Sequence, residues 1–298
     1  MITVIYSTHK DQEYNKKFKE NLEKYISIKD YEILEYQNNN EFSLAEIYNK
    51  GISEAKYDIV VCCHNDIKLG NDWGKKLLKI FNENPDYGII GKAGSWFFPK
   101  SGIYWERIKE TMVGQVYHQP DDKVKWLNEY SPKSPSLVPV VTVDGLFIAF
   151  DKRKIKHKFD ESLGGFHFYD HGFCVPNFLD GVKIGVTSSF VITHQSVGET
   201  NEEFFKTKNK FIEKYGNILP LVVKPKMKVL IGCLFFFSRT GSEMYVFELA
   251  KNLMKMDCDV TVVSPNINGV LVVEARNIGI KVNTFESLPK DVVFDIIH

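Results

Sequence analysis

The sequence lacks the features that mark secreted, membrane-spanning and nucleic-acid-binding proteins. No uninterrupted apolar run approaches the ~20 residues that a membrane span needs, and the N-terminus has no basic region followed by a long apolar stretch. An excess of one charge is also missing, because 38 Lys and Arg balance 38 Asp and Glu. Balanced charge gives no long-range field to attract nucleic acid. We therefore expect a soluble, cytoplasmic protein with no nucleic-acid partner, for which peripheral contact with a membrane surface stays open.

Cysteine is too scarce and too irregularly spaced for a disulfide framework. The five cysteines are an odd number, and two of them are adjacent in an apolar run. Cys62, Cys63 and His64 together could suggest a zinc site. However, consecutive strand residues point to opposite faces of a sheet and cannot all bind one ion. A reducing compartment and no structural zinc are the consistent expectations.

The N-terminal half of the 298 residues alternates between strand and helix patterns. Short runs rich in β-branched residues predict strands over 2–6, 31–36, 57–63 and 87–90. Apolar positions three to four residues apart predict an amphipathic helix after each of the first three strands. Ser43 and Glu46 form a capping-box pattern that fixes one helix start. This alternation predicts an α/β fold with a mainly parallel sheet.

The periodicity then changes twice along the chain. Residues 91–136 show no regular pattern and carry many aromatic rings, which are either packing residues or a platform for a sugar, with Trp105 the strongest candidate for the platform. Strand character returns over 138–150, and a helix is predicted over 202–215. Residues 217–226 contain two prolines and suit a linker. A new strand, loop and helix begin at Met227, which predicts a second α/β unit.

Polar clusters follow three of the predicted strands and should converge, because ligands bind beyond the carboxyl ends of parallel strands. The clusters are Ser7, Thr8 and His9; Gln37, Asn38 and Asn39; and His64, Asn65 and Asp66. A carboxylate at a strand end is well placed to hold a hard cation that neutralises a departing diphosphate. Asp66 is the best candidate for this role, although alone it could also be a turn or cap residue.

Three segments in the right order resemble one enzyme family. The stretch SLAEIYNKGISEAKYDIVVCCHNDI resembles the region before and through the metal-binding motif of family-two glycosyltransferases. TVDGLFIAFDK followed by FDESLGGFHFYDHGFC resembles the family's acceptor-side segment, and ITHQS resembles its terminal metal-binding histidine. The resemblance covers residues 1–216 and implies a GT-A nucleotide-diphospho-sugar transferase domain.

The resemblance also implies roles for individual residues. Asp66 and His194 would hold Mn²⁺ or Mg²⁺, and Asp170 would be the general base that removes a proton from an acceptor hydroxyl. Attack opposite the leaving diphosphate would invert the configuration of the transferred sugar. The residues expected to contact the donor are Ser7, Thr8, His9, Asn38, Asn49, His64, Asn65, Asp144 and Gly145. The expected donor is UDP-linked, and the expected acceptor is a glycan or lipid-linked molecule in surface polysaccharide synthesis.

Two departures from the family pattern keep other functions open. Asn65 stands where the metal motif usually has an acid, and Gly172 stands where a second acid often follows the base. These residues favour an alternative in which an inactive GT-A domain binds sugar or serves as a scaffold. His194 could likewise be a structural histidine at a strand end. A nucleotidyltransferase would also use a metal, but its glycine-rich phosphate loop is absent near the first strand.

The second unit resembles a different glycosyltransferase family. MKVLIGCLFFFSRTGSEMYVFELAKNL resembles the start of family-four enzymes of the GT-B type, and Gly241 and Glu243 match that family's glycine and glutamate. Residues 227–298 would then be a partial, Rossmann-like N-terminal lobe without activity of its own. An unfinished sheet would expose a strand edge, which favours docking or a homodimer.

Overall fold

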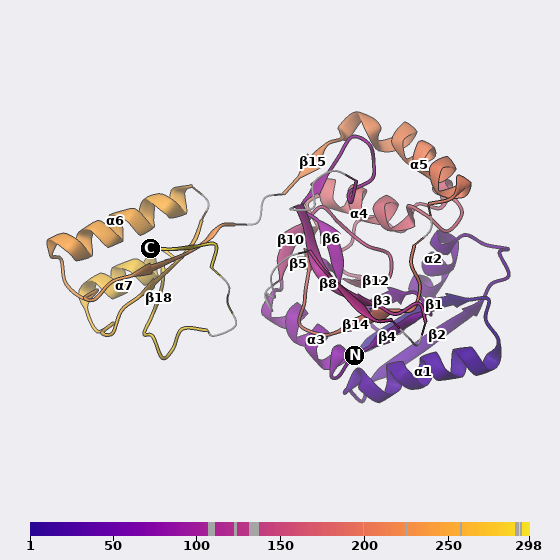
Figure 1. Cartoon of the computed structure of the whole chain (residues 1–298), viewed down its shortest axis with the longest axis horizontal. Helices are drawn as coiled ribbons and strands as arrows, with labels where there is room; N and C mark the ends of the chain where they lie inside the picture. Colours follow the sequence, from indigo (N-terminus) through magenta and orange to yellow (C-terminus); the bar gives the residue numbers. More distant parts are fainter. Residues whose placement is uncertain are drawn as a thin grey trace. The chain divides into compact units, whose positions relative to one another are not determined.

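The computed structural model describes residues 1–106, 111–121, 124–130, 137–198, 200–223, 226–256, 258–289, 292 and 294–298. The chain divides into two compact units, Met1–Lys224 and Pro225–His298, which are described separately (Figure 1). Each unit has its own apolar core.

The main sheet of the first unit is mixed, so the expectation of a mainly parallel sheet is wrong. Its order is β10-β13-β5-β12-β3-β1-β2. The strands are β1 (Ile2–Thr8), β2 (Tyr31–Gln37), β3 (Ile59–Cys63), β5 (Tyr87–Gly91), β10 (Val138–Val140), β12 (Phe147–Asp151) and β13 (Lys183–Val186). β1 runs parallel to β2 and β3, and β13 runs parallel to β5, whereas β12 is antiparallel to both β3 and β5. The apolar pattern of β12 marks it as a strand but carries no information on its direction.

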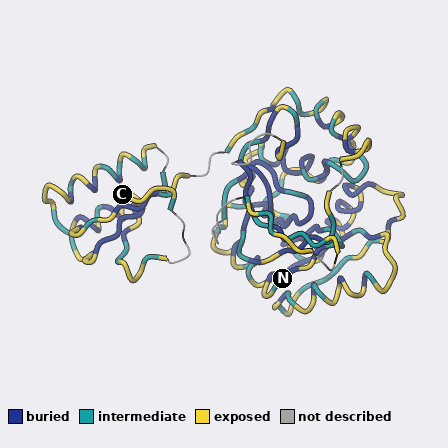
Figure 2. The backbone as a smooth tube through the Cα atoms, in the orientation of Figure 1, coloured by how far each residue is buried: buried dark blue, intermediate teal, exposed yellow. Residues whose placement is uncertain are grey.

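Helices cover both faces of this sheet, as the sequence predicts. Alternate residues of β1 enter different cores: Ile2, Val4 and Tyr6 join one core, and Ile5 joins the other. The first core also receives α1 (Gln12–Ile26) and α3 (Trp73–Glu83); the second receives α2 (Leu44–Glu54) and α4 (Tyr169–Leu179). The central strands are therefore buried on both faces, as Figure 2 shows in dark blue.

The predicted start of α2 is confirmed. Ser43 accepts a hydrogen bond from the backbone N–H of Glu46, and the Glu46 carboxylate accepts one from the backbone N–H of Ser43. This reciprocal pair satisfies two donors at the helix start. The helix therefore begins at a fixed point directly after the polar loop that follows β2, which places that loop beside the ends of β1 and β3.

A second sheet occupies part of the segment that the sequence presents as irregular, so that expectation is corrected. Its order is β11-β6-β8-β14-β4, with β9 paired to β8. The strands are β4 (Ile67–Leu69), β6 (Ala93–Ser95), β8 (Met112–His118), β9 (Trp126–Glu129), β11 (Thr142–Val143) and β14 (Ile192–His194). Apart from the seven-residue β8, these strands are short, and several contain polar residues, so the segment shows no clear alternation. Residues 107–110, 122–123 and 131–136 of that segment lie outside the described residues.

The predicted closing helix is present as α5 (Glu202–Tyr215), and the chain after it stays packed on the first unit. A short 3₁₀ helix, η3 (Gly216–Ile218), precedes Leu219, whose side chain is buried. β15 (Leu221–Val222) then pairs with β7 (Phe97–Phe98). Secondary structure of the first unit thus extends past the predicted linker start at residue 217, and linker residues 224 and 225 lie outside the described residues.

The second unit is a small α/β unit with a parallel four-stranded sheet. Its order is β18-β17-β16-β19, and every pairing is parallel. Its elements are β16 (Lys228–Gly232), α6 (Gly241–Lys255), β17 (Asp259–Val263), α7 (Val270–Asn277), β18 (Lys281–Asn283) and β19 (Ile296–Ile297). Both residues of β19 are exposed at the edge of the sheet.

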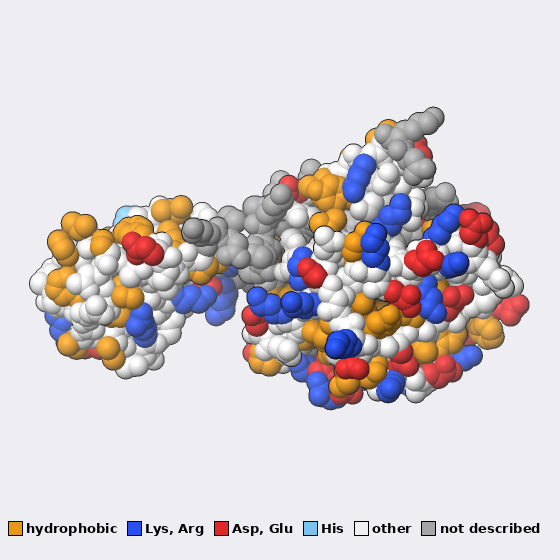
Figure 3. Space-filling model, turned by 90° about the horizontal axis from the view of Figure 1, so that it is seen from below, with side chains coloured by type: hydrophobic (Ala, Val, Ile, Leu, Met, Phe, Trp, Pro, Cys, Tyr) orange, Lys and Arg blue, Asp and Glu red, His pale blue; other side chains and the backbone are white. Residues whose placement is uncertain are grey.

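In the described part of the chain, no helix is long and apolar enough to cross a membrane. On the face of the first unit that Figure 3 shows, acidic and basic side chains alternate without a large patch of either sign. This arrangement agrees with the equal numbers of acidic and basic residues.

Candidate functional site

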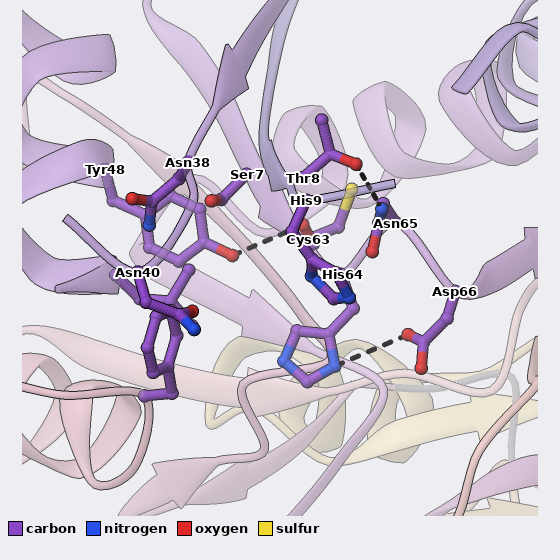
Figure 4. Close-up of a pocket in the computed structure, with 12 residues that line it drawn as sticks. Ser7, Thr8, His9, Asn38, Asn40, Tyr48, Cys63, His64, Asn65 and Asp66 are labelled. Atoms are coloured by element: carbon purple, nitrogen blue, oxygen red, sulfur yellow. Dashed lines mark hydrogen bonds and ion pairs between the residues drawn. The ribbon is translucent and has the colours of Figure 1, made fainter. Parts of the chain in front are cut away.

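A polar pocket lies where three strands of the main sheet end. Its cavity of about 220 Å³ is lined by Ser7, Thr8, His9, Asn38, Asn40, Leu44, Tyr48, Cys63, His64, Asn65, Asp66 and Phe166 (Figure 4). The three polar clusters of the sequence therefore meet, because β2, β1 and β3 are adjacent parallel strands. Seven of the predicted site residues line this one pocket: Ser7, Thr8, His9, Asn38, His64, Asn65 and Asp66.

Hydrogen bonds fix the β1 and β2 side of the pocket. The Thr8 hydroxyl donates to Oδ1 of Asn15 at 2.7 Å and accepts from Nδ2 of Asn65 at 2.8 Å. The backbone N–H of Asn38 donates to the carbonyl of Thr8 at 2.7 Å. The Asn38 side chain accepts from the backbone amides of Glu41 and Phe42, so it holds its own turn. This side of the pocket is preformed by the protein's own contacts.

On the other side of the pocket, two histidines face one carboxylate. Nδ1 of His64 lies 3.7 Å and Nε2 of His194 lies 3.4 Å from Oδ1 of Asp66. One ligand atom from each residue lies within 4.8 Å of the others. The side chains of His64 and Asp66 point toward each other in Figure 4. The structure thus joins the predicted metal residues Asp66 and His194 with His64, which the sequence assigned to the donor.

Strand pairing brings His194 to Asp66 from a distant part of the chain. β14 runs antiparallel to β4, with His194 opposite Ile67, the residue after Asp66. The backbone N–H of Gln195 donates to the carbonyl of Asp66 at 2.7 Å. The Ser196 hydroxyl lies 3.0 Å from Nε2 of His194. Sheet register therefore fixes the spacing between His194 and Asp66.

Two properties of the triad His64, Asp66 and His194 suit a divalent cation: a carboxylate oxygen without a hydrogen-bond partner and the protonation states of the three side chains. Among the described residues, Asp66 Oδ1 is the buried side-chain atom that has no hydrogen-bond partner. Burial alone would raise the pKa of Asp66, but His194 and His64 outweigh it and hold that pKa well below its usual range. Burial lowers the pKa of His64, which favours the neutral imidazole that binds metal. One carboxylate and two imidazoles are a donor set for divalent transition metals.

Asp170 lies in the first turn of α4, and backbone amides hold it. Its Oδ2 accepts from the N–H of Gly145 at 3.0 Å, and its Oδ1 accepts from the N–H of His171 at 2.8 Å. Burial raises the pKa of Asp170, and nearby Asp144 adds to the effect. Asp144 itself accepts from the Tyr104 hydroxyl at 3.1 Å. The predicted base and the predicted donor residues Asp144 and Gly145 therefore form one cluster.

Tyr169 is not among the site residues that the sequence predicts, although it directly precedes the predicted base Asp170. Its hydroxyl lies 2.7 Å from Nε2 of His64. A Cβ at Gly145 would lie 2.1 Å from the same hydroxyl oxygen, so only glycine leaves room for the phenol. Tyr169 therefore contacts both the triad and the Asp170 cluster. The signal in the sequence was its position beside Asp170, not its residue type.

Other predicted features lie away from the pocket. Asn49 does not line it, because its amide bonds the backbone N–H and carbonyl of Phe159, each at 2.9 Å. Trp105 packs edge-on against Tyr104 and is not part of the pocket lining, so the structure gives it a packing contact. Cys62 and Cys63 join opposite cores, which confirms that they cannot share one ion with His64.

The two departures from the family pattern have structural explanations. The Asn65 amide ties the turn before Asp66 to Thr8, so this residue orders the pocket floor. A Cβ at Gly172 would lie 2.6 Å from Cδ1 of Leu163. Packing of α4 against Leu163 thus leaves little room for a side chain at position 172.

Comparison with known proteins identifies the family and gives partial alignments with solved structures. A model of a family described as glycosyltransferase-like matches residues 3–215. Curated proteins give no match. GalNAc-T7, solved with UDP, GalNAc and Mn²⁺, aligns with a TM-score of 0.49 and 10% identity over 72% of this chain and 48% of its own. This chain thus spans about half the length of that protein.

Two further structures align with lower TM-scores. A197 from STIV gives a TM-score of 0.38 and 15% identity over 68% of this chain and 86% of its own. S. aureus TarS 1-349 gives a TM-score of 0.41 and 13% identity over 64% of this chain and 59% of its own.

Proposed function

We propose, on the premise that the chain belongs to this glycosyltransferase-like family, that its first unit is a GT-A domain that transfers sugar from a nucleoside-diphosphate sugar. The observation that carries the proposal is the unpartnered Asp66 oxygen between His64 and His194. It lies at the rim of a polar pocket beyond the carboxyl ends of parallel strands, where nucleotides bind in α/β proteins.

The pocket supports a division of the site into donor and metal sides. Ser7, Thr8, His9, Asn38 and Asn65 line the side of the pocket where we expect the nucleoside, which we expect to be uridine. Asp66 and His194 would hold Mn²⁺ or Mg²⁺, with His64 beside them. When bound, the cation supplies positive charge that offsets the charge of the departing diphosphate.

Asp170 is proposed as the general base for the acceptor hydroxyl. Two backbone amides orient its carboxylate, and its raised pKa makes it a stronger base than an exposed aspartate. The base takes the hydroxyl proton as the oxygen attacks the anomeric carbon and the diphosphate departs from the opposite face. A single displacement of this kind inverts the configuration.

The biological setting follows the family resemblance. We expect a glycan or lipid-linked acceptor and a role in bacterial surface polysaccharide synthesis. A cytoplasmic location suits the five cysteines, all of which are free. The exposed edge strand β19 would suit a homodimer. The molar mass of the purified chain, measured by light scattering, would reveal it.

A sugar-binding or scaffold function without turnover is the second candidate. Asn65 favours it, because the amide contributes no negative charge to a cation beside Asp66. In this case metal and nucleotide would bind, but no sugar would be transferred. The two candidates therefore differ in turnover and agree in binding.

A donor screen tests the proposal. Purified protein is mixed with a panel of nucleotide sugars and candidate acceptors, with Mn²⁺, with Mg²⁺ or with EDTA, and nucleotide release is measured. Metal-dependent release with one donor supports the enzyme, and NMR of the anomeric proton in the product reports inversion or retention. Metal-dependent UDP binding without release from any donor would favour the scaffold.

A further inference from the structure

We propose that Tyr169 is a positioning residue of the candidate metal site, which directs Nδ1 of His64 to the cation. The inference rests on the metal site of the proposed function and extends it. It links that site to the element that carries the proposed base, because Tyr169 and Asp170 are consecutive residues of α4.

The phenol of Tyr169 has little freedom to move. Its side chain is buried, and its ring packs edge-on against Tyr48 with ring centroids 5.7 Å apart. Phe159 lies on another side with centroids 6.3 Å apart, and the missing side chain of Gly145 leaves the space that the hydroxyl fills. Packing therefore holds the hydroxyl at the 2.7 Å distance from Nε2 of His64.

This contact engages Nε2 of His64, so Nδ1 is the nitrogen that remains for a metal. A neutral imidazole carries one proton, and a metal takes the nitrogen without it. With the proton on Nε2, His64 donates to the Tyr169 oxygen and leaves the lone pair of Nδ1 free. Nδ1 is the atom that faces Asp66 Oδ1, 3.7 Å away. Metal-binding histidines commonly donate their second N–H to such a partner, which fixes the ring and the tautomer.

The same contact connects the triad with the base. The N–H of Gly145 donates to Asp170 Oδ2, and the Tyr169 hydroxyl lies against Gly145. A rigid phenol thus maintains the spacing between the proposed leaving-group side and the proposed acceptor side. Reactions between bound groups are sensitive to such spacing.

Tyr169→Phe tests the inference because it keeps the buried ring and removes only the hydroxyl. We expect the dissociation constant for Mn²⁺, measured on the full chain with UDP by electron paramagnetic resonance of free Mn²⁺, to rise roughly 10- to 100-fold. Tyr6→Phe is the matched control: it removes another buried hydroxyl, bonded to Glu35 and outside the pocket lining, and should leave Mn²⁺ affinity unchanged.

A double-mutant cycle makes the test specific. In a His64→Ala background, Tyr169→Phe should cause no further loss of Mn²⁺ affinity, because the residue it orients is gone. The visible spectrum of bound Co²⁺ should change in His64→Ala, as expected for loss of a nitrogen ligand. Equal losses in both backgrounds, or unchanged affinity in Tyr169→Phe, would overturn the inference.

Failure of the inference and failure of the proposed function give different results. If the wild type binds Mn²⁺ and the cycle shows coupling, but no donor is turned over, the enzyme proposal fails and this inference stands. If donor turnover is metal-dependent but the cycle shows no coupling, the enzyme stands and Tyr169 has no positioning role. Absence of Mn²⁺ binding in the wild type, with and without UDP, overturns the metal site and this inference.

Discussion

Asp66 in the first unit and Glu243 in the second are both largely buried carboxylates in α/β units, and they differ in their partners. Glu243 accepts from the backbone amides of Phe237, Ser238 and Thr240, at 3.2, 3.3 and 3.2 Å, and from two hydroxyls of the same loop. The Thr240 hydroxyl and these loop donors, opposed by burial, lower the pKa of Glu243 to about 2. Asp66 has a buried oxygen with no such partner in the described residues.

The difference separates a structural carboxylate from one suited to bind a ligand. Leaving a buried carboxylate oxygen unpaired is costly unless a cation or substrate pairs with it. Glu243 instead uses the loop amides that could otherwise contact a phosphate at the start of α6. The backbone amides of Phe237, Ser238 and Thr240 are therefore bonded to Glu243 and are not free for an anion.

Removing the Asp66 carboxylate, whose Oδ1 has no hydrogen-bond partner in the described residues, should have the largest effect. Asp66→Ala should abolish metal-dependent UDP binding and leave the fold intact, because Asp66 lies at the pocket rim rather than in either core. Calorimetry with UDP, with and without Mn²⁺, measures this loss, and circular dichroism checks the fold. Undiminished Mn²⁺-dependent binding would place Asp66 in the same class as Glu243.

Asp170→Asn should separate chemistry from binding. The amide retains the shape but cannot take the acceptor proton, so turnover should fall by roughly 10²-fold or more while donor affinity is kept. Its N–H₂ group also replaces one acceptor of the Gly145 and His171 amides, so circular dichroism must show that the variant is folded. Steady-state kinetics and UDP calorimetry measure the two effects. Equal turnover would move the base to another residue, with Asp144 the neighbouring candidate.

The pH profile of the wild type offers an independent check on Asp170. The base works only when deprotonated, and its folded pKa is raised above the ordinary value by burial. Activity should therefore be lost as the pH falls through this raised pKa, at a higher pH than an exposed aspartate would give. Asp170→Asn should remove that acid limb from its residual activity.

Changing the paired carboxylate should affect stability and spare catalysis. Glu243→Gln places an N–H₂ group among loop donors, so the second unit should lose about 1–3 kcal/mol of stability. Amide hydrogen exchange in 228–263 measures this loss without assuming one transition for the whole chain. Glycosyl transfer should be unchanged, and a parallel loss of transfer would contradict the division of roles.

The sequence predicts the parts of the site that depend on local patterns. The ends of β1, β2 and β3 converge as expected, and the capping box of Ser43 and Glu46 fixes the start of α2. These features follow from apolar runs and neighbouring polar residues, which a single chain displays directly. The predicted roles of the pocket residues stay predictions until the variants are measured.

Long-range pairing explains what the sequence does not reveal. The antiparallel direction of β12 and the short strands of the second sheet depend on partners far along the chain. His194 meets His64 and Asp66 because β14 pairs with β4, and the Tyr169 contact depends on the space at Gly145. No periodicity or motif in one sequence encodes such register.

Deletion of the second unit should have the smallest effect on transfer. The pocket, the triad and Asp170 all belong to the unit Met1–Lys224, so a chain ending at Lys226 should retain the activity of the full 298 residues. A chain ending at Gly216 is the matched control, because it also lacks β15 and buried Leu219. Burial of one leucine contributes roughly 1.5–3 kcal/mol, so this shorter chain should melt at a lower temperature.

Thermal melting and donor turnover of the two truncations distinguish three outcomes. Full activity at Lys226 with a lower melting temperature at Gly216 would place the functional boundary after β15, where contacts with Phe97 and Phe98 end. Equal melting temperatures would show that Leu219 and β15 add little to the first unit. Loss of transfer in a folded chain ending at Lys226 would mean that residues after 226 contribute to the site, and the contrast between Asp66 and Glu243 would then no longer separate a working unit from a structural one.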